Sequence, residues 1–64
     1  MKNRIRIERA EHQISQAELA EKVKVSRQTI ISLETGKYTP STELALRLSK
    51  VFGKTVNELF SLEE

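Results

Sequence analysis

The sequence predicts an all-α fold, a compact bundle of five short helices, and three observations support this prediction. Apolar residues recur at the three- and four-residue spacing of a buried helix face through most of the chain. Serine or threonine stands at the N-cap position of four of these stretches, and glycine follows two of them. Alternation of apolar and polar residues is confined to residues 4–8. A strand there is the weaker alternative, and we expect no strands.

Two helices are expected in the first third of the chain. The first spans residues 3–12, with Asn3 as its N-cap. The second spans about 16–23 and begins at Ser15, whose hydroxyl caps the free N–H groups while Glu18 completes a capping box. The side chains expected to face inward from these two helices are Ile5, Leu19, Ala20 and Val23.

The third helix is expected over about residues 27–35, with Ser26 as its N-cap. It ends at Gly36, because glycine adopts the left-handed conformation of a C′ position at little cost. Ile30 and Leu33 are spaced to face inward, so the other side of this helix is free to meet a partner.

The C-terminal part of the chain predicts two further helices. The fourth begins at Ser41 or Thr42, after a proline that stops helical continuation, and ends at Gly53. The fifth is a turn or two long, with Thr55 as N-cap and Glu58 closing a second capping box. The residues expected on the inward faces are Leu44, Ala45, Leu48, Val51, Phe52, Val56, Leu59 and Phe60.

Composition limits the classes of function. The chain has 64 residues, 38% hydrophobic and 31% charged, which fits one small domain over residues 1–64. It has no cysteine and one histidine, so we expect no disulfide, metal or cofactor, and no catalytic constellation indicates an enzyme. No stretch is apolar enough for a signal sequence or a membrane span. We therefore expect a cytoplasmic protein with no membrane or small-molecule partner.

Charge distribution and helix geometry both indicate DNA. The net charge of +2 is modest, but residues 1–40 carry eight basic against five acidic side chains, whereas residues 41–64 carry three against four. Two short helices joined by a tight turn must cross steeply, so the second can project its N-terminal side chains into a major groove. We expect the N-terminal two-thirds of the chain to meet DNA.

A specific motif runs through the two central helices and the loop after them. Its residues are Ile14, Ser15, Gln16, Leu19, Ala20, Val23, Val25, Ser26, Thr29, Ile30, Leu33, Glu34, Gly36, Lys37 and Pro40. The motif resembles the Cro-like (XRE) helix-turn-helix family, which includes the phage lambda-type repressors and small prokaryotic transcriptional regulators. The resemblance covers nearly the whole chain and implies a lambda repressor-like domain that binds double-stranded DNA sequence-specifically. It also implies a nucleoid-associated cytoplasmic regulator of prokaryotic or phage origin.

By this resemblance, the helix over 27–35 is the recognition helix. Gln28 can bond an adenine bidentately, and Arg27 can do the same for a guanine or hold a phosphate. Ile31 can contact a thymine methyl group, and an equal alternative is partial burial against a neighbouring helix or simple tolerated exposure. The residues expected to read bases are Arg27, Gln28, Thr29, Ile31 and Ser32.

Phosphate contacts are expected at the edges of the motif. The resemblance implies that Gln16 contacts a phosphate and braces the recognition helix, and the N-terminus of its own helix also favours an anion. Lys37 and Tyr38 offer a point charge and a hydroxyl donor in the loop after the recognition helix, and Ser26 lies at the start of that helix. General attraction, or ordinary solvation, is expected for Arg4, Arg6 and Lys24.

Other positions concern stability. The resemblance implies a largely buried ion pair between Arg9 and Glu34 that fixes the third helix against the first. Gln13 and Lys24 occupy turn positions where many relatives have glycine, and a positive φ at either would cost about 1 to 2 kcal/mol. Glu8 occupies a place where relatives often have leucine, which thins the apolar stripe of the first helix.

A second copy of the chain is the expected protein partner. One recognition helix reads only a few base pairs, and a symmetric homodimer places two such helices about 34 Å apart on a pseudo-palindromic operator. We therefore expect a homodimeric repressor, with a protein-interaction module or antitoxin-type partner as the alternative. The candidates for the dimer surface are Leu46, Val56, Phe60 and Leu62, of which Phe60 is also a candidate for the core.

Overall fold

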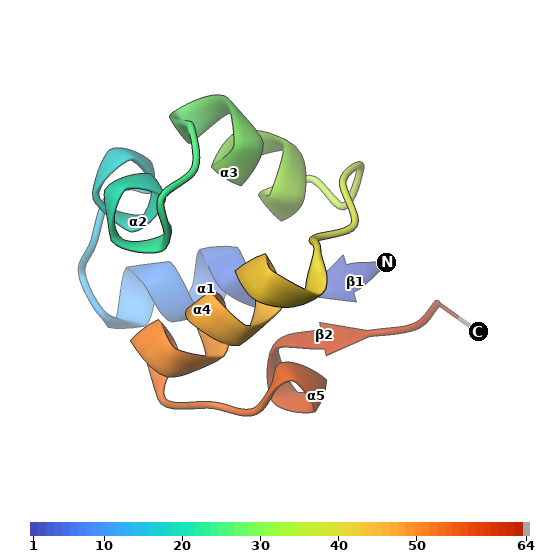
Figure 1. Ribbon diagram of the computed structural model, residues 1–64. Coiled ribbons are helices and arrows are strands. Elements are labelled where there is room, and N and C mark those ends of the chain that lie inside the picture. The colour runs from blue at the N-terminus through green and yellow to red at the C-terminus, as the bar shows by residue number, and fades with distance from the viewer. Residues whose placement is uncertain (64) are drawn as a thin grey trace.

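The computed structural model describes residues 1–63 and places five helices and a two-stranded sheet around an apolar core. Figure 1 shows α2 and α3 together at the top of the molecule, with the sheet beside both chain termini. The expectation of five helices is confirmed for the described residues. The elements in chain order are β1 (Lys2–Asn3), α1 (Ile5–Glu11), α2 (Gln16–Val23), α3 (Arg27–Glu34), α4 (Thr42–Phe52), α5 (Val56–Leu59) and β2 (Phe60–Ser61).

Side-chain caps set where four of the helices begin, as expected. At the start of α2, the Ser15 hydroxyl accepts the Glu18 N–H at 3.0 Å and the Glu18 carboxylate accepts the Ser15 N–H at 2.8 Å. Thr55 and Glu58 form the same capping box at α5, with distances of 3.2 and 2.8 Å. Each box satisfies donors that the first helical turn leaves without a partner. The single caps of α3 and α4 are Ser26 and Ser41.

The core consists of residues that the helical spacing predicts. Every side chain expected to face inward from α2 and α3 is at most 4% exposed. Val51 and Val56 are partly buried and pack against the core from α4 and α5. The buried apolar side chains are Ile5, Leu19, Ala20, Val23, Ile30, Leu33, Leu44, Ala45, Leu48, Phe52, Leu59 and Phe60.

The two ends of the chain depart from the prediction. Asn3 lies in β1, which pairs antiparallel with β2 so that Asn3 stands opposite Phe60. The first helix therefore begins at Ile5, and Phe60 opens β2 instead of ending the fifth helix. The expectations of no strands and of Asn3 as an N-cap are wrong. Two-residue strands show no alternation, and their pairing joins opposite ends of the chain, so no local pattern could reveal them.

Two turns hold non-glycine residues in the left-handed region. Gln13, between α1 and α2, has a φ of 56°, and Lys24, the C-cap of α2, has a φ of 61°. These are the positions where the resemblance suggests glycine, and each conformation costs roughly 1 to 2 kcal/mol for a residue with a Cβ atom. By contrast, Gly36 after α3 has a φ of 80°, as a glycine in that place allows.

Candidate nucleic-acid interface

The outward side of α3 presents the five residues expected to read bases, which we call the recognition face. Arg27 and Gln28 are exposed, whereas Thr29, Ile31 and Ser32 are partly buried. Ile30 and Leu33 are fully buried on the opposite side, where α3 packs against α2. The helix is therefore anchored through one side and free on the other, as groove insertion requires. The recognition face consists of Arg27, Gln28, Thr29, Ile31 and Ser32.

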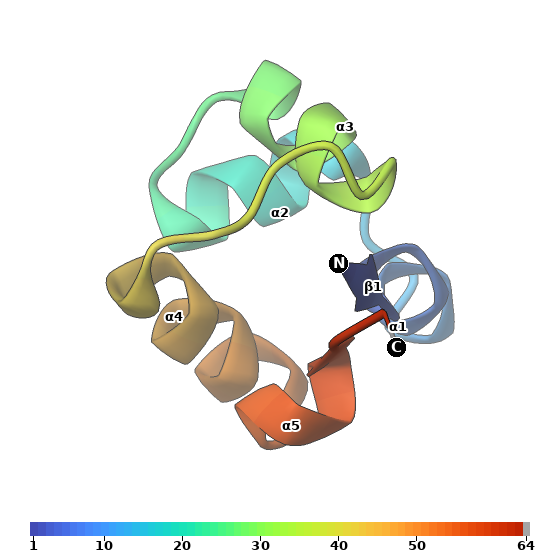
Figure 2. The same ribbon diagram turned by 90° about the vertical axis from the view of Figure 1, so that its right-hand side faces the viewer.

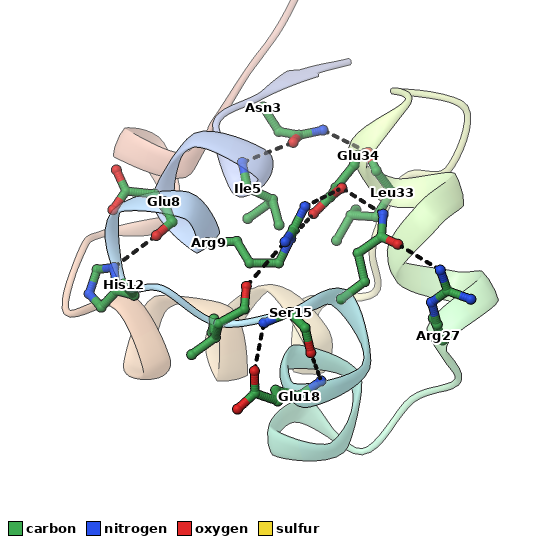
Figure 3. Close-up of polar contacts among 12 residues, drawn as sticks. Asn3, Ile5, Glu8, Arg9, His12, Ser15, Glu18, Arg27, Leu33 and Glu34 are labelled. Atoms are coloured by element: carbon green, nitrogen blue, oxygen red, sulfur yellow. Dashed lines mark hydrogen bonds and ion pairs between the residues drawn. The ribbon is translucent and has the colours of Figure 1, made fainter.

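A chain of polar contacts, the polar network, runs from α1 to the start of α3 (Figure 3). The Glu34 carboxylate accepts from Arg9 Nε at 2.7 Å and from Arg9 Nη2 at 3.4 Å. Its Oε1 also accepts from Gln16 Nε2 at 3.1 Å, and Gln16 Oε1 accepts from Arg27 Nη2 at 3.4 Å. Arg9 Nη1 donates to the Ile14 carbonyl at 3.1 Å. The network orients the Gln16 amide and the Arg27 guanidinium relative to each other.

The ion pair expected between Arg9 and Glu34 is present and lies largely out of water. The Arg9 side chain is 20% exposed and that of Glu34 only 6%. A guanidinium fork that meets both oxygens of a carboxylate fixes direction as well as distance. The pair therefore holds the last turn of α3 against α1 in one orientation.

The expected phosphate contacts border the recognition face. Gln16 lies at the first position of α2, while Lys37 and Tyr38 are exposed in the loop after α3. The Ser26 hydroxyl is exposed, caps α3 and lies 2.9 Å from the Thr29 hydroxyl. Each of these residues therefore lies next to one end of α3 or, in the case of Gln16, is bonded to its first residue.

Ile31 lies in a hollow between α1, α2 and α3 and is partly buried there. This agrees with the alternative that Ile31 packs against a neighbouring helix, and it leaves part of the side chain exposed. Arg6 also lines this hollow and is exposed, although the sequence indicated only general attraction for it. Its place three residues before Arg9, on the same side of a helix, was the available signal. The hollow is lined by Arg6, Arg9, Gln16, Ile31, Glu34 and Thr35.

Three of the four dimer candidates, Leu46, Val56 and Phe60, line one surface hollow, and Leu62 is not among its lining residues. Leu46 is 59% exposed and Leu62 is 74% exposed. Phe60 is only 9% exposed and belongs to the core, yet its edge lines an apolar surface hollow together with Leu46 and Val56. We call this the C-terminal hollow. Pro40 and Ala45 also line it.

A second charged cluster lies behind α1, away from the recognition face. Glu8 is fully buried, and its Oε2 accepts from Lys54 Nζ at 2.9 Å and lies 3.6 Å from Arg4 Nε. Its other oxygen, Oε1, is buried without a hydrogen-bond partner. The hydrogen bond from Lys54 lowers the pKa of Glu8 despite burial, and the same bond raises the pKa of Lys54. The sequence indicated only that Glu8 interrupts an apolar stripe.

Two kinds of feature are not found among the described residues, a cluster of metal ligands and a membrane-spanning helix. Among residues 1–63, no group of three or more metal-ligating side chains comes together. His12 is exposed, its Nδ1 lies 2.9 Å from the Glu8 carbonyl, and its ring packs against that of Phe52 in an edge-to-face arrangement, with the ring centroids 5.1 Å apart. Within the same residues, no helix has the length and apolar character to cross a membrane.

An open helix supported by a steeply crossing partner, with basic and amide side chains at its start, defines a helix-turn-helix DNA-binding protein. The family profile described as "Helix-turn-helix" matches residues 5–59, and the chain belongs to this family, in the XRE class. Members of the family are DNA-binding transcriptional regulators and not enzymes.

The chain is also similar over its full length to proteins of archaea and bacteria. It is 47% identical to an uncharacterized HTH-type transcriptional regulator of Methanocaldococcus jannaschii, of which it covers 97%. It is 45% identical to an uncharacterized HTH-type transcriptional regulator of Archaeoglobus fulgidus, of which it covers 91%. With the uncharacterized HTH-type transcriptional regulator YgzD of Bacillus subtilis it shares 44% identity and 97% coverage.

Proposed function

We propose that this protein is a homodimeric repressor that binds a pseudo-palindromic operator sequence-specifically. The observation that carries the proposal is the polar network, which fixes Gln16 and Arg27 beside each other at the open start of α3. Side chains held in one orientation lose little conformational freedom on binding, so they favour a defined contact over diffuse attraction. The protein acts on DNA in the cytoplasm, and it represses transcription if the bound dimer blocks the access of RNA polymerase to a promoter.

Within this proposal, the recognition face meets base edges and its borders meet phosphates. Gln28 bonds an adenine and Arg27 a guanine or a phosphate, while the exposed part of Ile31 contacts a thymine methyl group. Thr29 and Ser32 are the remaining base-reading residues. The proposed phosphate contacts are Gln16, Ser26, Lys37 and Tyr38.

The proposed dimer forms at the C-terminal end of the molecule. Leu46 and Leu62 are exposed there, and Val56 with the edge of Phe60 lines the C-terminal hollow next to Leu46. An exposed apolar surface of this kind gains free energy when a second copy covers it. A two-fold dimer then presents two recognition faces to successive major grooves, about 34 Å apart.

Selection of bound sequences from a random DNA pool tests the proposal directly. We expect an inverted repeat with half-sites about one helical turn apart, and a complex with two protein chains per duplex. Affinity for random DNA should also fall steeply as salt rises from about 50 to 200 mM, since bound phosphates release counterions. A pool that yields no enriched sequence, or a binding constant insensitive to salt, would favour a protein-interaction module instead.

Ile31→Asn tests the proposed thymine contact. We expect a changed preference at one A·T position of the selected site, by roughly 1 to 3 kcal/mol, and an unchanged fold. Ile7→Asn serves as the matched control, because it replaces an exposed apolar side chain that belongs neither to the recognition face nor to the proposed dimer surface. Equal relative affinities of Ile31→Asn and the unmodified protein across operator variants would contradict the contact.

A further inference from the structure

Asn3 uses both ends of its side-chain amide to connect two helices (Figure 3). Its Nδ2 donates to the Leu33 carbonyl, in the last turn of α3, at 2.8 Å. Its Oδ1 accepts from the Ile5 N–H, at the first position of α1, at 3.1 Å. The last four carbonyls of a helix have no partner within the helix, so an amide that bonds one of them fixes that end of the helix in place.

The backbone around Asn3 is itself held by the C-terminal part of the chain. Asn3 stands opposite Phe60 in the sheet, and the Arg4 N–H donates to the Leu59 carbonyl at 2.9 Å. Figures 1 and 2 both show β1 between the end of α3 and β2. Phe60 also lines the C-terminal hollow. The Asn3 amide is therefore a short connection between the proposed dimer surface and the end of α3.

Side-chain contacts thus fix the direction of α3 at both of its ends. Arg27, at the first position, bonds Gln16 of α2, and Leu33, in the last turn, bonds Asn3 of β1. An eight-residue helix is about 12 Å long, and its last turn is also held by the pair of Arg9 with Glu34, whose carboxylate accepts from Gln16 as well. Loss of the Asn3 contact leaves Glu34 as the remaining polar contact of this end with other helices, so the end of α3 can pivot about it while the buried side chains hold the middle. Base contacts depend on the direction of the helix in the groove, whereas phosphate attraction does so much less.

We infer that Asn3 is a positioning residue for sequence recognition, setting the direction of α3 through the Leu33 carbonyl. The inference rests on the proposed function, because it concerns how that function discriminates between sequences. Asn3 need not touch DNA in this role. Its loss lowers the ratio of operator affinity to random-DNA affinity, because that ratio measures base contacts alone.

Two substitutions isolate the contact between Asn3 and Leu33. Asn3→Asp keeps an oxygen for the Ile5 N–H but has no donor for the Leu33 carbonyl. Asn3→Ser has an oxygen for α1 on a side chain too short to reach α3, and it leaves the net charge unchanged. The matched controls are Asn57→Asp and Asn57→Ser, at an exposed position of α5. For all four variants, dissociation constants are measured on the selected operator and on a random duplex at one salt concentration, together with the midpoint of thermal unfolding.

We expect the ratio of operator to random-DNA affinity to fall about tenfold in both Asn3 variants and to stay constant in both Asn57 variants. A merely structural role cannot produce this result, since a larger unfolded fraction lowers both affinities by the same factor. A ratio that stays constant in Asn3→Ser while the two affinities fall together overturns the inference. Should one Asn3 variant fail to fold, the ratio in the other decides. Failure of the proposed function is distinguishable, because the unmodified protein would then already bind operator and random DNA equally.

Discussion

The neighbouring residues Glu8 and Arg9 of α1 take part in two ion pairs, each with a nearly buried carboxylate, and the two pairs differ in how completely that carboxylate is hydrogen-bonded. Figure 3 shows Arg9 pointing toward Glu34 of α3 and Glu8 pointing to the other side of α1. Glu8 pairs with Lys54, in the turn after α4. Both oxygens of Glu34 have partners, and one of them also accepts from Gln16. Glu8 uses one oxygen and leaves the other buried without a partner. Only the first pair continues into the proposed DNA interface.

The difference between the two pairs shows when a buried ion pair stabilises a fold. Desolvation of two charges costs several kcal/mol, and attraction recovers that cost only when the remaining hydrogen-bonding positions are also filled. The Arg9 guanidinium donates to both oxygens of Glu34 and so fixes the direction of the Glu34 side chain, which the single ammonium group of a lysine cannot do. The pair with Lys54 connects α1 to the C-terminal part without such completeness. We expect the first pair to be essential to the interface and the second to be replaceable.

The largest effect is expected when the first pair is broken. Arg9→Gln or Glu34→Gln leaves a largely buried charge without its counter-charge, which should lower the free energy of unfolding by about 3 to 5 kcal/mol. Urea unfolding at neutral pH followed by circular dichroism measures this change. DNA binding should also weaken in any folded remainder, since Gln16 loses its orientation. A loss below about 1 kcal/mol would show that this pair is as replaceable as the other.

The contribution of the second pair, Glu8 with Lys54, should appear in the pH dependence of stability. The hydrogen bond from Lys54 lowers the pKa of Glu8 below its ordinary value of 4.5, so the ionised form stabilises the fold above that pH. This contribution disappears as the pH falls through the depressed pKa. The hydrogen bond from Glu8 raises the pKa of Lys54 above 10.5, so the corresponding contribution disappears as the pH rises through the raised value. Thermal midpoints should therefore fall on both sides of a plateau from about 4.5 to 10.5.

The Glu8→Gln variant shows whether ionised Glu8 causes the fall in thermal midpoint at acid pH, which we call the acid limb. We expect a shallower fall in thermal midpoint below pH 4.5 than in the unmodified protein. Some acid sensitivity should remain, because the backbone N–H groups of Ser15 and Thr55 lower the pKa of Glu18 and of Glu58 in the two capping boxes. Parallel acid limbs in the two proteins would assign the whole effect to those boxes.

Much of the fold could be predicted because its signals are local. Ser15 with Glu18, and Thr55 with Glu58, mark helix starts within four residues of sequence, and Gly36 marks a helix end. Apolar spacing likewise predicts which side of each helix is buried. The pairing of Arg9 with Glu34 came from the resemblance to a known family and not from spacing, since the two residues lie on different helices.

What the sequence did not reveal depends on contacts between distant segments. Glu8 interrupts an apolar stripe, and nothing in its neighbourhood indicates that Lys54 neutralises it. Asparagine is a residue type that favours N-cap positions, but Asn3 pairs with Phe60 in the sheet and therefore lies outside the helix. Its amide is directed to the Leu33 carbonyl. Such contacts join residues that only the complete tertiary fold brings together. The base and phosphate contacts remain predictions, because they involve a partner that the chain alone does not specify.

The substitution Glu8→Leu should be tolerated or beneficial. A leucine side chain would fill this fully buried place with apolar atoms and remove the oxygen that has no partner. Lys54, whose side chain is 35% exposed, can return its ammonium group to water. We expect the thermal midpoint at neutral pH to stay the same or rise by up to about 5 °C, with unchanged operator affinity. A large fall in midpoint would mean that the second pair is as indispensable as the first.

The smallest effect is expected for Arg4→Gln, which repeats near the start of α1 the substitution proposed for Arg9. Arg4 also faces a buried carboxylate, but its Nε lies 3.6 Å from Glu8 Oε2 and its side chain is 50% exposed. Water screens such a contact and the side chain gives up freedom to make it, so the loss should stay below about 0.5 kcal/mol. Urea unfolding of both Arg→Gln variants in one buffer compares them directly. Equal losses at the two positions would mean that net positive charge near α1 stabilises the fold, and that the fork geometry of Arg9 contributes nothing beyond its charge.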